Sequence, residues 1–244
     1  MERKTVVIAQ SDLERQKAVC EQIREYWLAQ GRTPLAFVDT YGCQQNEADS
    51  ERIRGMLQSC GYQLSDTEEG ADCIVINTCA IREHAETRVY GNVGALVHTK
   101  ARHPGQKIFL CGCMMGQPAV ADRIKKSYRH VDGVFNPHQL WRFPELLQFV
   151  LAHNKRIFAT DDSAGNIAEG LPVVRTSDLK AWVSIMYGCN NCCLSPWDAT
   201  ISAPTASCPT CGAANGRAGR MKFWKRCAHW SPRATRTSRC WART

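Results

Sequence analysis

An α/β fold with a flavodoxin-like, mostly parallel sheet is the fold class that the sequence predicts for residues 34–155. Short apolar runs, which are typical of buried strands, alternate in this region with longer segments of helical character. Glycines stand where two of the helical segments stop, at Gly31 and Gly61. Strands that alternate with helices imply crossover connections, and such connections produce a parallel sheet in a three-layer domain.

The elements can be assigned in order along the chain. A first helix is expected at residues 11–30, with Ser11 as its N-cap. Its apolar face consists of Leu13, Val19, Ile23 and Trp27. Five strands are then expected at residues 35–38, 62–64, 71–77, 107–111 and 133–136. The helices that follow strands are expected at residues 46–60, 82–100, 118–128 and 139–153.

Four further regions flank the predicted domain. Residues 1–33 form an N-terminal helical extension, and residues 156–180, which lack periodicity, form a linker. The segment 181–191 is the first strand of a second α/β domain. Residues 192–244 form a basic tail, which we expect to be disordered because it carries too little patterned apolar surface to offset the ordering entropy.

Composition narrows the class of protein. The sequence contains no apolar run long enough to span a membrane, and charges interrupt the N-terminus too early for a secretory signal. We therefore expect a cytoplasmic protein with no membrane partner. The 14 cysteines are more typical of metal binding or catalysis than of disulfides in such a compartment.

The net charge of +8 comes from the tail alone. Residues 192–244 contain nine Lys and Arg but one acid, Asp198, whereas residues 1–191 contain 22 basic and 22 acidic side chains. The charge of the whole chain therefore does not indicate a nucleic-acid partner for the predicted domain.

Three cysteines share one position in the predicted fold. Cys43, Cys79 and Cys113 follow the first, third and fourth strands. Loops at the carboxyl ends of parallel strands converge on one crevice, and thiolates gathered there are typical ligands of an iron–sulfur cluster. Zinc is the competing metal, although it prefers paired CxxC motifs, and buried structural thiols are the alternative without a metal.

The remaining cysteines of the predicted domain lie inside elements. Cys20, Cys60 and Cys73 fall on helix or strand interiors and are expected to be buried structural thiols. Cys111 neighbours Cys113 but lies on the strand and not in the loop.

The segments around the three loop cysteines resemble a known family. TYGCQQNEADSERI, INTCAIREHAETRVYGNVGAL and LCGCMMGQ resemble the N-terminal domain of the tRNA methylthiotransferases, especially the MiaB type. AWVSIMYGCNN resembles the entry to their radical-SAM barrel, so the resemblance covers residues 34–191. It implies that Cys43, Cys79 and Cys113 hold an auxiliary 4Fe-4S cluster that carries the sulfur to be inserted.

The resemblance also implies an activity. Members of this type add a methylthio group to isopentenylated adenosine beside the tRNA anticodon, with S-adenosylmethionine, two 4Fe-4S clusters and an electron donor. Sister families act on threonylcarbamoyl-adenosine or on a ribosomal protein, and Arg82 and Glu83 favour the MiaB type. Asn46, Asn77 and Arg82 could contact the cluster or RNA, but helix capping and surface solvation explain them equally well. A non-enzymatic iron–sulfur-binding domain is the alternative function.

The catalytic motif of the family is incomplete in this sequence. Its CxxxCxxC pattern supplies three thiolates and leaves one iron for S-adenosylmethionine. Cys189 and Cys193 match the first two positions, but Pro196 occupies the third and has no ligand atom. Cys192 is adjacent to Cys193 and cannot take that role. We therefore expect this chain to be an inactive, truncated member of the family.

A shifted reading frame accounts for the tail. The third base of each codon, joined to the first two of the next, permits CNNFCSYCIV over Asp198–Cys208, which contains the complete motif. Arg220–Thr244 likewise permits DEILEEVRALVSEGYKDVTLLGQN, which has an apolar helical period. We interpret the tail as a frameshift product. As written, Cys208 and Cys211 form a CxxC pair without the second pair that a zinc ribbon needs.

Overall fold

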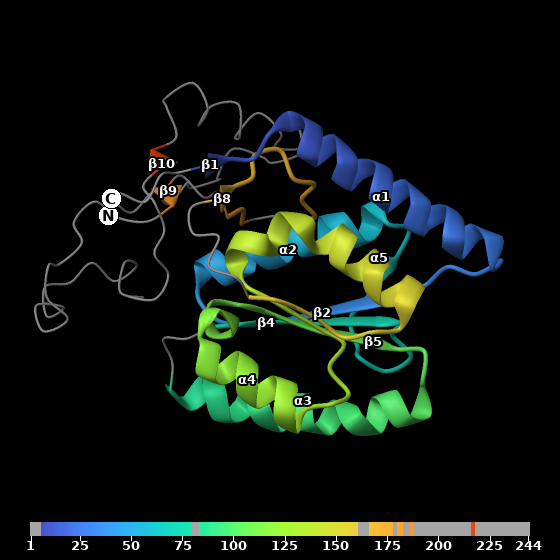
Figure 1. Ribbon diagram of the computed structural model, residues 1–244, viewed down its shortest axis with the longest axis vertical. Coiled ribbons are helices and arrows are strands. Elements are labelled where there is room, and N and C mark those ends of the chain that lie inside the picture. Colours follow the sequence, from blue (N-terminus) through green and yellow to red (C-terminus); the bar gives the residue numbers. More distant parts are fainter. Residues whose placement is uncertain are drawn as a thin grey trace, which may run out of the picture.

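The computed structural model describes residues 6–79, 83–160, 166–177, 180–182, 186–187 and 216–217. Its main body is a sheet of six parallel strands with helices on both faces (Figure 1). The strand order is β3-β2-β4-β5-β6-β7. The strands are β2 (Leu35–Tyr41), β3 (Gln63–Ser65), β4 (Cys73–Thr78), β5 (Lys107–Gly112), β6 (Gly133–Phe135) and β7 (Ile157–Ala159).

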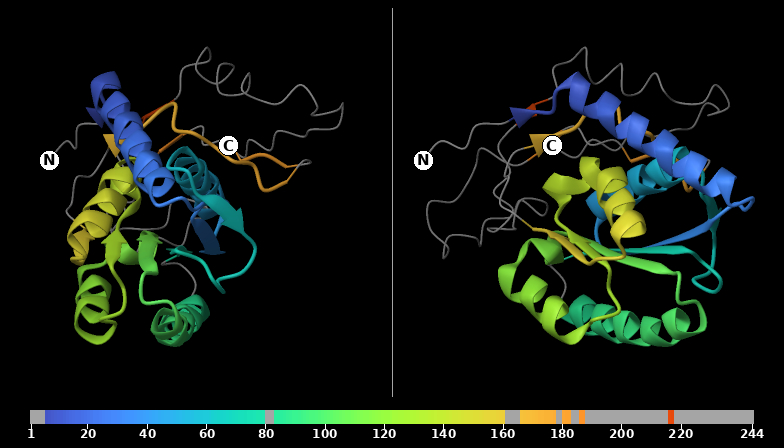
Figure 2. Two further views of the ribbon diagram at one scale, coloured as in Figure 1. Left: turned by 90° about the vertical axis from the view of Figure 1, so that its right-hand side faces the viewer. Right: turned by 45° about the vertical axis from the view of Figure 1, so that its right-hand side comes forward.

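Two layers of helices cover the sheet. The helices are α1 (Gln10–Ala29), α2 (Gln44–Ser59), α3 (Glu83–Arg102), α4 (Pro118–Ser127) and α5 (Phe143–His153), with short 3₁₀ helices η1 (Cys113–Gly116) and η2 (Pro137–Arg142). Helices α3 and α4 cover one face, whereas α2 and α5 cover the other, with α1 packed outside them (Figures 1 and 2).

The central strands are buried on both faces, and their side chains alternate between two apolar layers. Along β4, Val75 belongs to the layer beneath α2 and α5, whereas Ile74 and Ile76 belong to the layer above α3 and α4. On β5, Phe109 packs edge to face against Phe143 of α5. This packing fixes which side chains of each strand face α2 and α5 and which face α3 and α4. It therefore also fixes where each strand ends.

The N-terminal helix is docked on the domain. Helix α1 contacts α2 and α5, and buries Leu13, Ile23 and Trp27 as predicted. Val19 is only partly buried. The predicted N-cap is wrong, because the helix begins at Gln10, one residue before Ser11, and no side chain caps it.

The α/β class and the parallel sheet are confirmed, but the predicted count of five strands is wrong. The sixth strand, β7, continues the sheet beyond β6 in a region that the sequence assigned to the linker. Two small strand pairs also occur: β1 (Val6–Val7) with β8 (Asn166–Ile167), and β9 (Met186–Tyr187) with β10 (Gly216–Arg217).

Apart from residues 181–182, 186–187 and 216–217, the predicted second domain and tail lie outside the described residues, and the domain boundaries stay predictions. Within the described part of the chain, no helix combines the length and apolarity needed to cross a membrane.

Candidate metal centre

The three loop cysteines stand at the carboxyl ends of three neighbouring strands. Cys43 follows β2, Cys79 follows β4 and Cys113 follows β5, with β4 between the other two strands. The sequence predicted this placement, and the strand order confirms it. No other strand lies between the loops that carry these thiols.

The pairing register sets how closely the three loops approach. Tyr41 pairs with Thr78, and Thr78 pairs with Gly112, so the last residues of the three strands lie in one row across the sheet. Paired strands are about 4.8 Å apart. Cys79 and Cys113 each come one residue after this row and Cys43 comes two residues after it. The three backbones therefore leave the sheet side by side.

The thiols differ in exposure. Cys79, which follows the central strand, is 1% exposed, whereas Cys43 and Cys113, which follow the strands on either side, are partly exposed. Within the described ranges, no three His, Cys, Asp or Glu residues lie close enough to hold a single metal ion. The thiolates of an iron–sulfur cluster bind separate irons, so they surround a larger object than one ion. Three thiols at adjacent strand ends suit that larger group.

A buried asparagine network ties the first two loops together. Asn46, in the first turn of α2, is 1% exposed, and its Oδ1 lies 3.3 Å from both the backbone N and the Sγ of Cys43. Its Nδ2 donates to Asn77 Oδ1 and to the Thr78 carbonyl, both at 2.9 Å. Asn77 Nδ2 donates in return to the Asn46 carbonyl at 2.8 Å and to Ser50 Oγ at 3.0 Å. The start of α2 is therefore fixed to the end of β4.

Asn46 and Asn77 are thus interior residues, and the surface-solvation explanation for them is wrong. Both side-chain amides form hydrogen bonds within the protein. These bonds stabilise the loops, because a buried amide without a hydrogen-bond partner lowers the free energy of unfolding. The sequence did not indicate Ser50, although it lies four residues after Asn46 and hence on the same helix face.

A glycine brings the third loop against the second. Gly112 has φ 100° and ψ −176°, a backbone conformation that L side chains rarely adopt. A Cβ at this position would lie 2.5 Å from Asn77 Oδ1 and closer still to the Thr78 carbonyl. Thr78 Oγ1 also donates to the Cys111 carbonyl at 2.6 Å. The conformation of Gly112 therefore determines where Cys113 leaves the sheet.

The other described cysteines are buried, as expected for Cys20, Cys60 and Cys73. Burial raises the pKa of the Cys73 and Cys111 thiols above the ordinary range. A hydrogen bond with Cys20, followed by burial, raises the pKa of the Cys60 thiol. Thiols held in the protonated form are poor metal ligands. Cys60, Cys73 and Cys111 are therefore poor candidates for metal ligands.

Tyr41, at the end of β2, is a neighbour of the site that the sequence did not single out. Burial, reinforced by Asp39, raises the pKa of Tyr41 to about 12. Its hydroxyl oxygen accepts a hydrogen bond from Asn92 of α3. The phenol therefore stays neutral near pH 7 and acts as a fixed polar group between β2 and α3.

Cys189, Cys193 and Arg82 lie outside the described residues, so the structure does not test their predicted roles.

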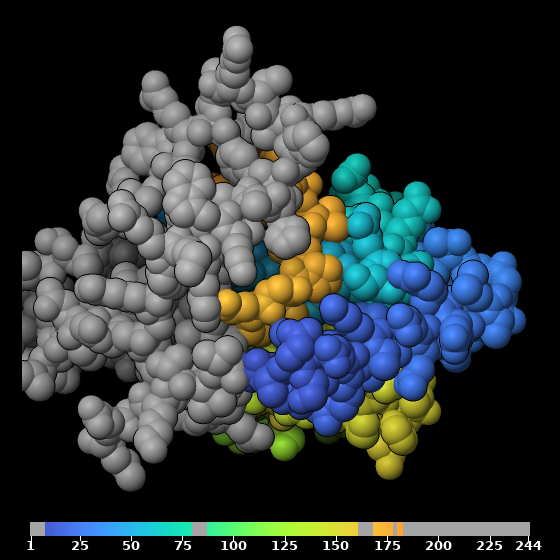
Figure 3. All heavy atoms as spheres, turned by 90° about the horizontal axis from the view of Figure 1, so that it is seen from above, coloured from blue at the N-terminus to red at the C-terminus, as the bar shows by residue number. Residues whose placement is uncertain are grey.

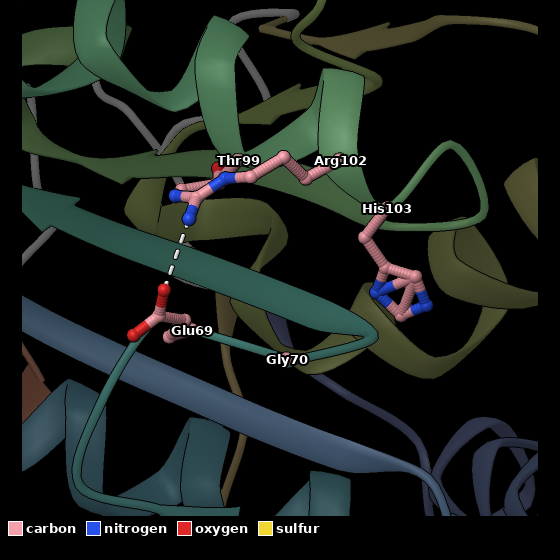
Figure 4. A pocket seen from close by; sticks show the side chains of 5 residues that line it. All are labelled: Glu69, Gly70, Thr99, Arg102 and His103. Atoms are coloured by element: carbon pink, nitrogen blue, oxygen red, sulfur yellow. Dashed lines mark hydrogen bonds and ion pairs between the residues drawn. The ribbon is translucent and has the colours of Figure 1, made fainter.

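A shallow hollow of about 280 Å³ lies near the amino ends of β4 and β5, opposite to the strand ends that carry the cysteines. It is lined by Glu69, Gly70, Thr99, Arg102 and His103 (Figure 4). An exposed ion pair of 3.0 Å between Arg102 and Glu69 spans it. This hollow contains none of the predicted site residues.

Comparisons with known proteins place the three cysteines in a shared domain. Residues 36–136, which include all three, match the uncharacterized protein family UPF0004. The chain is 46% identical over 195 residues to the tRNA-2-methylthio-N(6)-dimethylallyladenosine synthase of Clostridioides difficile, a match that covers 78% of this chain and 41% of the relative.

Two further relatives carry the same name. The protein of Alkaliphilus oremlandii is 44% identical over 191 residues, which cover 78% of this chain and 40% of the relative. That of Acetivibrio thermocellus is 40% identical over 196 residues, which cover 79% and 41% respectively. The chain spans about two-fifths of the length of these relatives.

Proposed function

We propose, because this chain is a homologue of the tRNA-2-methylthio-N(6)-dimethylallyladenosine synthases, that it is the cluster-binding part of such an enzyme. The whole enzyme would add a methylthio group to isopentenylated adenosine beside the anticodon of tRNA in the cytoplasm. The observation that carries the proposal is the row formed by the ends of β2, β4 and β5, from which the three loop cysteines emerge.

Cys43, Cys79 and Cys113 would hold a 4Fe-4S cluster, with one iron left free of protein ligands. When bound, the cluster would supply the sulfur for the reaction. The protein's own part is to fix the three loops. Asn46 holds the Cys43 loop to β4, and Gly112 holds the Cys113 loop against the same strand.

The second cofactor set belongs to the part of the enzyme beyond the described domain. Cys189 and Cys193 would be two ligands of the cluster that binds S-adenosylmethionine, but Pro196 replaces the third. A separate electron donor would be required. We therefore propose that this chain binds the auxiliary cluster without carrying out methylthio transfer.

A non-enzymatic iron–sulfur-binding domain is the second candidate. The observation that favours it is that the three cysteines each follow a strand of the six-stranded sheet, whose strands all lie within residues 35–159. The sister activities on threonylcarbamoyl-adenosine or a ribosomal protein are less well supported, because the relatives reported above carry the dimethylallyladenosine name.

Anaerobic reconstitution with ferrous iron and sulfide separates a chain that binds one cluster from a complete enzyme with two clusters and from a chain with structural thiols only. We expect about four irons per chain and the absorbance of one 4Fe-4S cluster. Twice that iron content, with methylthio-adenosine formed in isopentenylated tRNA, would indicate a complete enzyme and contradict our proposal of an inactive chain. Failure to retain any iron would support structural thiols instead.

The frameshift requires its own test. Sequencing the gene across codon 192 should recover the family's CxxxCxxC motif in a neighbouring frame. A tail encoded in the same frame by genes of several related organisms would contradict the frameshift.

A further inference from the structure

The segment after β8 is attached to α2 and is not a free linker. We name residues 171–176 the strap. Leu171 packs against the apolar layer that includes Leu57 and Val75, and the Val174 N–H donates to the Glu51 carbonyl at 3.0 Å. Figure 3 shows this segment, in orange, on the surface beside α1, in blue.

Glu51 is the centre of the attachment. Its side chain is 1% exposed. Helix α2 has two other acidic residues, Glu47 and Asp49, but the described hydrogen bonds between an acidic side chain of α2 and the strap are made by Glu51. Glu51 pairs with Arg175 and receives hydrogen bonds from Thr176, through its N–H at 3.4 Å and its Oγ1 at 3.5 Å. A buried carboxylate is costly unless it is paired, and the strap supplies the partners.

Gly55, one helical turn after Glu51, lies where the strap crosses α2. A Cβ on Gly55 would lie 2.5 Å from the Pro172 carbonyl carbon and 2.7 Å from the Val173 nitrogen. Residues four apart share one helix face. Glycine stabilises a helix interior less than alanine does, so Gly55 weakens α2 while it leaves room for the strap.

The strap also leads toward the predicted second domain. Arg175 Nη1, besides pairing with Glu51, donates to the Trp182 carbonyl at 2.9 Å. Glu51 lies eight residues after Cys43, so the attachment is about 12 Å along α2 from the first loop cysteine. Helix α2, which begins directly after Cys43, therefore also holds the chain that continues toward Cys189.

We propose that Glu51 and Gly55 on α2, with Arg175 on the strap, are positioning residues. They hold the start of the second domain near the strand ends from which the three loop cysteines emerge. The purpose of this arrangement rests on the proposed function, because two cofactors that act on one substrate need a fixed separation. The attachment itself does not depend on any cluster.

Hydrogen–deuterium exchange of the full chain tests the attachment, with Gly55→Ala as the main variant. We expect exchange in residues 171–177 to become at least about tenfold faster, because the added methyl group displaces the strap. Gly91→Ala is the matched control, since Gly91 also lies within a helix but has no atom within 4 Å of its Cβ position. Strap exchange that is equally slow in wild type, Gly55→Ala and Gly91→Ala would overturn the proposal.

A second variant decides the matter if Gly55→Ala fails to fold. Arg175→Ala removes a side chain of the strap and leaves the sequence of α2 intact. It should speed exchange at residues 174–176 and 180–182 by a larger factor than in the strands of the six-stranded sheet. Arg175→Lys should restore part of the protection at residues 174–176, because lysine keeps the pairing with Glu51. Unchanged exchange in Arg175→Ala would refute the positioning role.

The two proposals can fail separately. If wild-type chain binds no iron but the strap variants behave as expected, the attachment stands and the proposed function falls. If iron binds and the strap variants exchange like wild type, the function stands and the positioning role is wrong.

Discussion

Gly112→Ala should displace Cys113 and destabilise the domain. The alanine would have to adopt φ 100° and ψ −176°, which costs about 1–3 kcal/mol for a residue with a Cβ. Its methyl group would also meet the Thr78 carbonyl and Asn77 Oδ1, and crowding of this kind costs about 1–3 kcal/mol. We therefore expect the free energy of unfolding to fall by about 3 kcal/mol, which is more than a hundredfold in the folding equilibrium.

Urea unfolding under anaerobic conditions, followed by the fluorescence of the buried residues Trp27 and Trp141, measures this loss. Gly116→Ala is the matched control, because Gly116 lies four residues later in η1 and a Cβ there would meet no atom within 4 Å. Iron retained after reconstitution should fall in Gly112→Ala and not in Gly116→Ala. If both variants unfold at the wild-type midpoint and retain equal iron, the role assigned to Gly112 is refuted.

Three further predictions concern the network, a buried acid and α1. Asn46→Ala should lower iron retention and reduce the free energy of unfolding by about 3 kcal/mol, since it leaves buried hydrogen-bond partners unpaired. Asn136→Ala, directly after β6, is the control: it should lower the urea midpoint but retain the iron. Burial raises the pKa of Asp49, so its contribution to stability is lost as the pH rises above the ordinary carboxyl range. Asp49→Asn should therefore gain stability relative to wild type between about pH 4 and about pH 7, and a pH-independent difference in urea midpoint would contradict this. Ile23→Ala should lower the free energy of unfolding by about 2–5 kcal/mol if α1 is part of the core. Leu28 is 70% exposed, so Leu28→Ala should change the free energy of unfolding little. Equal losses in the two variants would show that α1 is not docked.

Strong apolar runs made the central sheet predictable from the sequence. The run at 71–77 contains β4 apart from its last residue, Thr78, and the stop at Gly61 matches the end of α2. By contrast, β7 has three residues between charged and polar segments, and only its pairing with β6 makes it a strand. Ser11 is a good capping residue, but the observed helix begins one residue earlier, within the usual uncertainty of helix ends.

The site was predictable where it depends on topology and not where it depends on side-chain packing. Parallel strands place the loops of Cys43, Cys79 and Cys113 at one edge whatever the details of packing. The strap could not be predicted, because a buried ion pair and backbone hydrogen bonds hold it. Such contacts produce no periodic pattern of apolar residues in the sequence of residues 171–176. Glu51 likewise resembles a surface acid in the sequence, and only the folded chain shows its partners.

The central claim is that three thiols from three strand ends hold one cluster. Replacing Cys43, Cys79 and Cys113 in turn by alanine, with Cys111→Ala as the control, and counting iron after anaerobic reconstitution tests it most directly. We predict that each of the three variants loses most of its iron while Cys111→Ala retains the wild-type amount. Wild-type iron content in any one of the three would contradict the claim.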